Sequence, residues 1–299
     1  MMHNIIKLIR PKHWLKNIFV FIPLIFSLKF TEITSIINVL IVFIAFCLLA
    51  SAIYILNDIF DKDKDQNHPI KKHRPIAQNS ISIKKAYCLF GLFSIISLMI
   101  ALYLNINTFI AFSLYLILNI LYSIKFKNLV IFDVFFIALG FVLRVYAGAF
   151  VISISVSHWI ILTTFFISLF LGFGKRRSEY ILLKDNLLPK RSVLNLYSEK
   201  LLTIFIIISL TLTIIMYALY TISPATINKF NHDNLIYTVP IVVYGIFRYL
   251  YLIFVKSNED DVTEIVIKDK LLLSVIIIWF ISVIFLIYFG QQIGKILSP

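Results

Sequence analysis

The stretch of sequence that decides the fold is IINVLIVFIAFCLLASAIYILNDIFDKDKD, residues 36 to 65. Residues 36 to 57 are almost wholly apolar, and an α-helix needs about 20 such residues to cross the hydrocarbon core of a bilayer. The stretch then ends in an alternating run of aspartate and lysine from Asp61 to Asp65, preceded by Asn57 and Asp58. This pattern predicts a membrane helix that carries a charged cluster at one water-facing end.

The rest of the chain has the same apolar character. Of its 299 residues, 60% are hydrophobic and only 14% are charged, whereas soluble domains contain about 25% charged residues. Apolar windows of spanning length predict nine transmembrane helices near residues 17–30, 36–57, 86–104, 107–124, 129–151, 157–173, 201–222, 235–255 and 271–289. We therefore expect an all-α, polytopic membrane protein that forms a single domain over residues 1–299.

Basic residues gather on one side of these predicted helices. Most of the 28 lysines and arginines lie before the first window, in the loops 58–85 and 174–200, or in shorter connections on the same side. Because basic loops stay in the cytoplasm, we expect a cytoplasmic N-terminus and an outside C-terminus. The net charge of +13 is explained by this topology and by attraction to anionic lipid, so no nucleic acid partner is needed.

The acidic run has a helical pattern. If the helix continues through it, Asn57, Asp58, Asp61 and Asp65 fall within an arc of roughly 100°, whereas Asp63 points elsewhere. Carboxylates on one helix face repel one another unless a positive charge lies among them, and Mg²⁺ prefers such oxygen ligands. The spacing favours a Mg²⁺ ion bound to a diphosphate. The alternative is a set of solvated charges that each contribute little.

Cationic segments surround the acidic run. The sequence HPIKKHRP follows at residues 68–75, where two prolines favour an extended turn. Lys125 and Lys127 follow the window at 107–124, and GKRRSE at 174–179 follows a later one. Lysine and arginine beside a metal are typical ligands for phosphates, although these residues could also serve only as basic cytoplasmic loops.

Three charged residues lie well inside predicted helices. Asp133 and Arg144 are 11 residues apart, which places them on one face about 16 Å apart, together with Gly140 and, less closely, Gly148. This face could line a cavity or form a helix interface; both remain open for Arg144, and a cavity is favoured for Asp133. Arg248 needs a buried anionic partner or must extend to the membrane surface.

These positions indicate a Mg²⁺-dependent transfer from a diphosphate donor, with one reactant soluble in the membrane. No P-loop or dinucleotide-binding motif is present. A transporter would also be compatible with many helices and with the intramembrane arginines. It would more naturally show charges at mid-depth on several helices and internal repeats, which the sequence lacks.

The run N-D-x-x-D-x-x-x-D at residues 57–65 resembles the first signature of the UbiA superfamily of intramembrane prenyltransferases. Further marks occur in order along almost the whole chain: RPKHWLKN (10–17), HPIKKHRPIA (68–77), YSIKFKNLVIFD (122–133), LRVYAG (143–148) and GKRRSE (174–179). Together they are most similar to the branch that moves phosphoribose from phosphoribosyl diphosphate onto a polyprenyl phosphate, decaprenyl or undecaprenyl. The resemblance implies helices around a central cavity that opens to the cytoplasm in a bacterial inner membrane.

The resemblance also implies roles for individual residues. Asp58, Asp61 and Asp133 would be catalytic, and Mg²⁺ would be held by Asn57, Asp58, Asp61 and Asp65. The substrate-binding residues would be Lys16, Asn17, Lys71, Arg74, Tyr122, Lys127, Arg144, Lys175 and Arg176. The product would serve as a precursor of lipid-linked pentose donors.

One position departs from ordinary prenyltransferases. Their second aspartate motif is usually of the type D-x-x-x-D, but here Asp133 is followed by Ile137 where the second acid would stand. This difference argues against a prenyl diphosphate donor. A prenyltransferase that joins a polyprenyl diphosphate to an aromatic acceptor remains the alternative interpretation.

Overall fold

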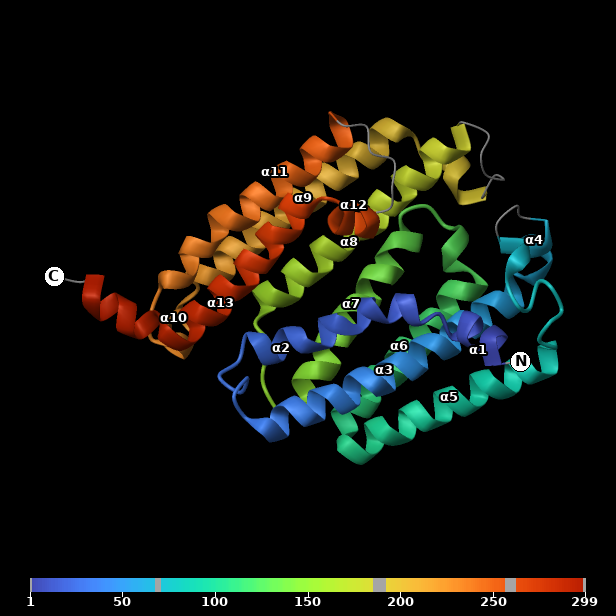
Figure 1. Ribbon diagram of the computed structural model, residues 1–299, viewed down its shortest axis with the longest axis horizontal. Coiled ribbons are helices and arrows are strands. Elements are labelled where there is room, and N and C mark those ends of the chain that lie inside the picture. Colours follow the sequence, from blue (N-terminus) through green and yellow to red (C-terminus); the bar gives the residue numbers. More distant parts are fainter. Residues whose placement is uncertain (1, 68–70, 185–191, 256–261, 298–299) are drawn as a thin grey trace. The chain divides into compact units, whose positions relative to one another are not determined.

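The computed structural model describes residues 2–67, 71–184, 192–255 and 262–297 (Figure 1). Within these ranges every regular element is an α-helix or a 3₁₀ helix. The chain divides into two compact units, one of residues 1–156 with 186–196 and the other of residues 157–185 with 197–299. Each unit is described by itself.

The first unit contains α1 (Met2–Ile9), η1 (Pro11–Phe21), α2 (Ile22–Ile25), α3 (Ile33–Phe60), α4 (Lys62–Gln66), η2 (Lys71–His73), α5 (Ile83–Leu104), α6 (Ile106–Ile124), η3 (Phe126–Asn128), α7 (Phe132–Val151) and η4 (Ser192–Leu196). The second contains α8 (His158–Lys184), α9 (Glu199–Ile222), α10 (Pro224–Phe230), η5 (Asn234–Thr238), α11 (Val239–Phe254), α12 (Val262–Lys268) and α13 (Lys270–Leu297).

Eight helices of the described residues are long and apolar enough to cross a membrane. They are α3, α5, α6, α7, α8, α9, η5 with α11, and α13, and they confirm eight of the nine predicted windows. The short loop predicted between the third and fourth windows is the single residue Asn105. Its side chain accepts a hydrogen bond from the backbone N–H of Thr108 at 2.7 Å, and this cap starts α6 directly after α5 ends.

The first predicted window, residues 17–30, does not form a long α-helix. Its residues belong to η1, α2 and a following turn, and Pro23, which has no backbone N–H to donate, lies where η1 passes into α2. The 3₁₀ geometry rises about 2.0 Å per residue, so η1 and α2 together still extend about 28 Å, close to the roughly 30 Å of a hydrocarbon core. The segment of η1 and α2 is therefore nearly long enough to cross a membrane, although most of it is a 3₁₀ helix and not an α-helix.

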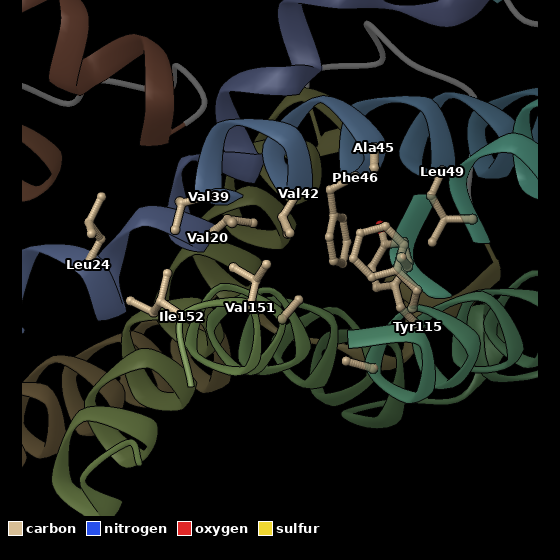
Figure 2. Packing of buried hydrophobic residues seen from close by; sticks show 14 of the residues in the cluster. Val20, Leu24, Val39, Val42, Ala45, Phe46, Leu49, Tyr115, Val151 and Ile152 are labelled. Carbon is tan, nitrogen blue, oxygen red and sulfur yellow. The ribbon is translucent and has the colours of Figure 1, made fainter. Parts of the chain in front are cut away.

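The core of the first unit lies between η1, α3, α6 and α7. Figure 2 shows Phe46 extending from α3 toward Tyr115 of α6, and the ring centroids are 4.8 Å apart. Val20 of η1 is fully buried in the same cluster. Since lipid tails are as apolar as these side chains, close packing rather than burial from water holds the helices together.

The predicted loop at 174–200 is wrong over its first part, because α8 continues through the GKRRSE motif to Lys184. Lys, Arg, Glu and Leu are good helix formers, and the ion pair between Arg176 and Glu179 joins successive turns of α8.

Arg248 pairs with an anionic side chain that is half-buried, Asp269, so it has a partner of the kind that the sequence left as one of two alternatives. Its guanidinium donates two hydrogen bonds to Asp269, at 3.3 Å from Nε and 2.7 Å from Nη2. Asp269 also accepts a hydrogen bond from the backbone N–H of Leu272 at 2.7 Å, at the start of α13. The ion pair therefore joins α11 to the N-terminal turn of α13.

His232 packs tightly in the second unit. The backbone N–H of Asn234 donates to its Nδ1 at 3.2 Å, and a Cβ on Gly290 of α13 would lie 2.5 Å from its Nε2. Burial lowers the pKa of His232 below its ordinary value of 6.5, because apolar surroundings disfavour the charged imidazolium.

We expect the second unit to lose stability in acid through His232. The lowered pKa favours the folded state fully above about pH 6.5, and this contribution disappears as the pH falls through the folded-state pKa. Thermal unfolding of the purified protein between pH 7.5 and 5 should therefore depend less on pH in His232→Gln. The exposed His158 provides the control, and equal pH slopes in His232→Gln and His158→Gln would contradict this role.

Candidate functional site

The acidic run lies where α3 passes into α4. The helix is interrupted at Asp61, whose φ and ψ are −96° and 6°, but the helical hydrogen bonds continue across the interruption. The backbone N–H of Asp61 donates to the Asn57 carbonyl at 2.9 Å, and that of Asp65 donates to the Asp61 carbonyl at 2.8 Å. The near-helical backbone keeps Asp58, Asp61 and Asp65 on one side. Asp63 is exposed, which agrees with the predicted arc.

Two of these aspartates are buried and share one arginine. Asp58 and Asp65 are 2% and 3% exposed. Nη1 of Arg74 lies 3.0 Å from Oδ1 of Asp58 and 2.6 Å from Oδ2 of Asp65. Arg10 also forms an ion pair with Oδ1 of Asp58. The repulsion between the two buried carboxylates is therefore offset by two guanidinium groups of the chain itself.

The third aspartate is bound from another helix connection. Nζ of Lys127, in η3, lies 2.6 Å from Oδ1 of Asp61. Lys127 is buried, and its ion pair ties the α6–α7 connection to the end of α3. Ser123 of α6 donates a hydrogen bond to Oδ1 of Asn57. These contacts bring the end of α3, α4, η3 and the residues next to η1 and η2 into one charged cluster, which we call the acid–base cluster: Arg10, Asp58, Asp61, Asp65, Arg74 and Lys127.

Arg10 was not among the predicted site residues, although it lies in the RPKHWLKN motif. Its backbone is left-handed, with φ 51° and ψ 63°, which costs an arginine about 1 kcal/mol or more. The conformation turns the chain sharply between α1 and η1. Leu8 anchors α1, since it is fully buried against Ile55 and Ile59 of α3. The strain is thus maintained by packing that holds Arg10 against Asp58.

Hydrogen bonds fasten the start of η1 to α3. Nε1 of Trp14 donates to the Ser51 hydroxyl at 3.0 Å, and this hydroxyl donates to the Ile9 carbonyl at 3.0 Å. The Arg10 guanidinium also lies over the Tyr54 ring, 5.2 Å from its centroid. Ser51 and Tyr54 therefore support the turn that carries Arg10.

Arg144 and Asn17 are bonded to each other inside the first unit. Nε of Arg144 donates to Oδ1 of Asn17, Nη1 to the Gly140 carbonyl and Nη2 to the Tyr115 hydroxyl, each at 2.8 Å. The guanidinium also lies within about 5 Å of the Phe46, Tyr115 and Phe141 ring centroids. These contacts favour the helix-interface interpretation of Arg144, because it joins η1, α3, α6 and α7.

Gly148 belongs to the same interface. A Cβ at this position would lie only 1.9 Å from the Val20 carbonyl oxygen. A Cβ at Gly140 would make ordinary contacts, at 3.4 Å from Tyr115 and 3.5 Å from Arg144. The backbone of η1 therefore lies so close to Gly148 of α7 that no side chain fits there.

The other predicted site residues fall into two groups. Lys16, Lys71 and Tyr122 are half-buried in the first unit, and Asp133 is fully buried in the first turn of α7. Lys175 and Arg176 lie on α8 of the second unit, where Arg176 pairs with Glu179 and the neighbouring Arg177 pairs with Glu199 at 3.2 Å. His68 and Pro69 of the HPIKKHRPIA motif lie outside the described residues.

In the part of the chain that the structure describes, no three His, Cys, Asp or Glu side chains are grouped closely enough to hold an ion by themselves. The positive charges among the carboxylates are instead Arg10, Arg74 and Lys127. These pairs use Oδ1 of Asp58 and Asp61 and Oδ2 of Asp65. Mg²⁺ commonly uses one or two carboxylates together with water and substrate phosphates, so the donor chemistry suits that ion without a ready cage.

Two relatives match the chain over nearly its full length. The decaprenyl-phosphate phosphoribosyltransferase of Mycolicibacterium smegmatis is 28% identical over 298 residues, which cover 96% of this chain and 93% of that protein. The protein of the same name from Corynebacterium glutamicum is 30% identical, covering 95% and 87% respectively.

Solved structures show the same fold. A UbiA homolog from Archaeoglobus fulgidus bound to GPP and Mg²⁺ superposes with a TM-score of 0.73 at 22% identity, covering 95% of this chain and 99% of that one. A digeranylgeranylglyceryl phosphate synthase gives a TM-score of 0.67 at 19% identity, covering 95% and 98%. The sequence model of the UbiA prenyltransferase family matches residues 18–268. This chain, an all-helical transferase with its charged cluster at the end of α3, belongs to the UbiA prenyltransferase family.

Proposed function

We propose that this protein transfers 5-phosphoribose from phosphoribosyl diphosphate to a polyprenyl phosphate, decaprenyl or undecaprenyl, and releases diphosphate. The observation that carries this proposal is the acid–base cluster, in which three aspartates are interleaved with Arg10, Arg74 and Lys127. Such a cluster offers oxygen ligands to a divalent cation and guanidinium and ammonium groups to phosphates. The names of the two bacterial relatives favour phosphoribose as the transferred group.

The acidic half of the cluster would hold Mg²⁺ through Asp58, Asp61 and Asp65, with Asn57 beside them. When bound, Mg²⁺ supplies positive charge that stabilises the leaving diphosphate. Arg10, Arg74 and Lys127 would bind the diphosphate oxygens, since their side chains already lie among the carboxylates. The protein thereby favours departure of the leaving group.

The acceptor needs no general base, because a lipid phosphate is already an anion. Its oxygen would attack C1 of the ribose with inversion, while the bond from C1 to the diphosphate oxygen breaks through an oxocarbenium-like state. Asp133 would orient a ribose hydroxyl or stabilise the positive carbon. Lys16, Lys71, Tyr122, Lys175 and Arg176 are the proposed contacts for the 5-phosphate and the ribose.

Asn17 and Arg144 were predicted to bind the substrate, but we assign them a different role from the other predicted substrate ligands. Both are buried and bonded to each other, at 0% and 5% exposure. We propose that they act on the substrate indirectly, by fixing η1 and therefore Arg10.

The basic residues support a cytoplasmic site in the bacterial inner membrane. The acid–base cluster follows the water-facing end of α3 in a segment rich in lysine and arginine. If η1 and α2 cross the membrane as their combined length allows, nine crossings place the N-terminus in the cytoplasm and the C-terminus outside. The polyprenyl phosphate would then enter from the cytoplasmic leaflet.

A transfer assay tests the proposal. Membranes containing the protein receive phosphoribosyl diphosphate labelled in the ribose, Mg²⁺ and a polyprenyl phosphate, and we expect label in the lipid phase only when all three are present. Parallel membranes receive geranyl diphosphate and an aromatic acceptor. Prenylation of the acceptor by folded protein without transfer of phosphoribose would overturn the proposal in favour of the prenyltransferase alternative.

A further inference from the structure

The acid–base cluster is balanced in charge. Asp58, Asp61 and Asp65 are matched by Arg10, Arg74 and Lys127, and each aspartate is paired with at least one of these cations. Arg74 is central, because one nitrogen bridges Asp58 and Asp65. Because the three acids and the three cations of the cluster neutralise one another, the cluster has no excess charge that would attract either a metal ion or a phosphate alone.

We propose that the cluster binds a divalent cation and a diphosphate group together, by exchanging its internal ion pairs for pairs with the two ligands. This inference rests on the proposed function, because it concerns the same site. On binding, the carboxylates release Arg10, Arg74 and Lys127 and turn toward the cation. The released side chains then bind the diphosphate oxygens. Every buried charge has a partner before the exchange and after it.

Either ligand alone leaves part of the cluster unpaired. A metal cation that binds the carboxylates without a diphosphate displaces Arg74 from Asp58 and Asp65. The guanidinium of Arg74 then has no anionic partner in the cluster. A diphosphate without a cation draws Arg74 away and leaves Asp58 and Asp65 beside each other, at 2% and 3% exposure, without their shared cation. An unpaired buried charge is unfavourable, so each ligand strengthens the binding of the other.

The positions of the paired atoms make this exchange possible. The ion pairs engage one oxygen of each carboxylate, and Arg74 and Arg10 remain 26% and 19% exposed. Arg74 lies directly after η2. Arg10 and Arg74 therefore have access to solvent, while Asp58 and Asp65, which they cover, are buried. In the third pair the acid is the more accessible partner, because the Asp61 side chain is 28% exposed and that of Lys127 only 10%.

The test measures binding of a metal without any diphosphate. Mn²⁺ takes the same oxygen ligands as Mg²⁺, and its free form is counted by electron paramagnetic resonance. In the purified full chain we expect Arg74→Gln to bind Mn²⁺ alone about tenfold more tightly than the wild type, because Asp58 and Asp65 are no longer neutralised. The same variant should bind inorganic diphosphate with Mn²⁺ more weakly than the wild type.

Lys72→Gln is the matched control, since it removes the same charge from an exposed neighbouring position. It should leave both affinities within about twofold of wild type. Unchanged Mn²⁺ affinity in Arg74→Gln, or an equal increase in Lys72→Gln, would overturn the exchange. If Arg74→Gln does not fold, Lys127→Gln makes the same test at Asp61.

The two proposals fail in different ways. Transfer of phosphoribose by the wild type, with Mn²⁺ affinity unchanged in folded Arg74→Gln, would overturn the exchange and leave the proposed function standing. The expected Mn²⁺ affinities without any transfer of phosphoribose would support the exchange and overturn the proposed function.

Discussion

Asp58→Asn is expected to lower the rate of phosphoribosyl transfer by at least about 100-fold. Asp58 is 2% exposed and pairs with both Arg10 and Arg74. An amide has one oxygen and no charge, so it would neither hold Mg²⁺ well nor keep the two guanidinium groups in place. The transfer assay measures this loss directly, at equal amounts of folded protein.

The same substitution also affects folding, which requires a control. Removing one partner of a buried ion pair costs roughly 3 kcal/mol, at the low end of the usual range because both arginines keep part of their hydration. Asp63→Asn changes the same chemical group five residues away, where the side chain is exposed. We expect Asp63→Asn to keep nearly full activity and stability. Equal activity in the two variants would remove Asp58 from the site.

Gly148→Ala is expected to have the second largest effect, although Gly148 lies far along α7 from the aspartates. The added Cβ would lie 1.9 Å from the Val20 carbonyl oxygen, so η1 must move. Overpacking of this kind costs about 1–3 kcal/mol. Since Arg10 directly precedes η1, a displacement of about 1 Å at the site is expected to lower the transfer rate by up to about 100-fold.

Gly140→Ala is the control for this prediction, because it makes the same substitution on the same helix. Its Cβ would meet Tyr115 at 3.4 Å, which is ordinary contact. We expect Gly140→Ala to keep most of the activity and thermal stability. If Gly148→Ala and Gly140→Ala behave alike, the close approach of η1 to α7 does not position Arg10.

Much of the fold could be predicted because each membrane helix carries its signal locally. The apolar window at 36–57 predicts α3, and a polar residue that caps the following helix, such as Asn105, marks a tight connection. These local signals failed where the same amino-acid composition is compatible with two different conformations. The first window forms η1 and α2, with Pro23 where one passes into the other, and the GKRRSE motif continues α8 although its charges resemble a loop.

The candidate site could be predicted only in part. The helical period placed Asp58, Asp61 and Asp65 together, but it could not reveal which cation neutralises them. Arg10 lies 48 residues from Asp58, and Lys127 lies 66 residues from Asp61. Such pairs depend on the folding of η1 and η3 against α3, which no local pattern encodes.

Arg144 illustrates the same limit. Its burial was predictable from its place in an apolar helix, whereas its partner Asn17 lies 127 residues away. The small residues Gly140 and Gly148 were the available signal for a close helix interface. They left a cavity and a helix interface both open on that face of α7, and they did not identify η1 as the neighbour.

The most direct measurement uses phosphoribosyl diphosphate that carries ¹⁴C in the ribose and ³²P in the diphosphate. Membranes with the protein, Mg²⁺ and a polyprenyl phosphate should place ¹⁴C in the lipid phase and release an equal amount of ³²P as free diphosphate. Both products should disappear together in Asp58→Asn. Recovery of ³²P in the lipid, or release of ³²P diphosphate without ¹⁴C in the lipid, would contradict transfer of phosphoribose from the acid–base cluster to the lipid phosphate.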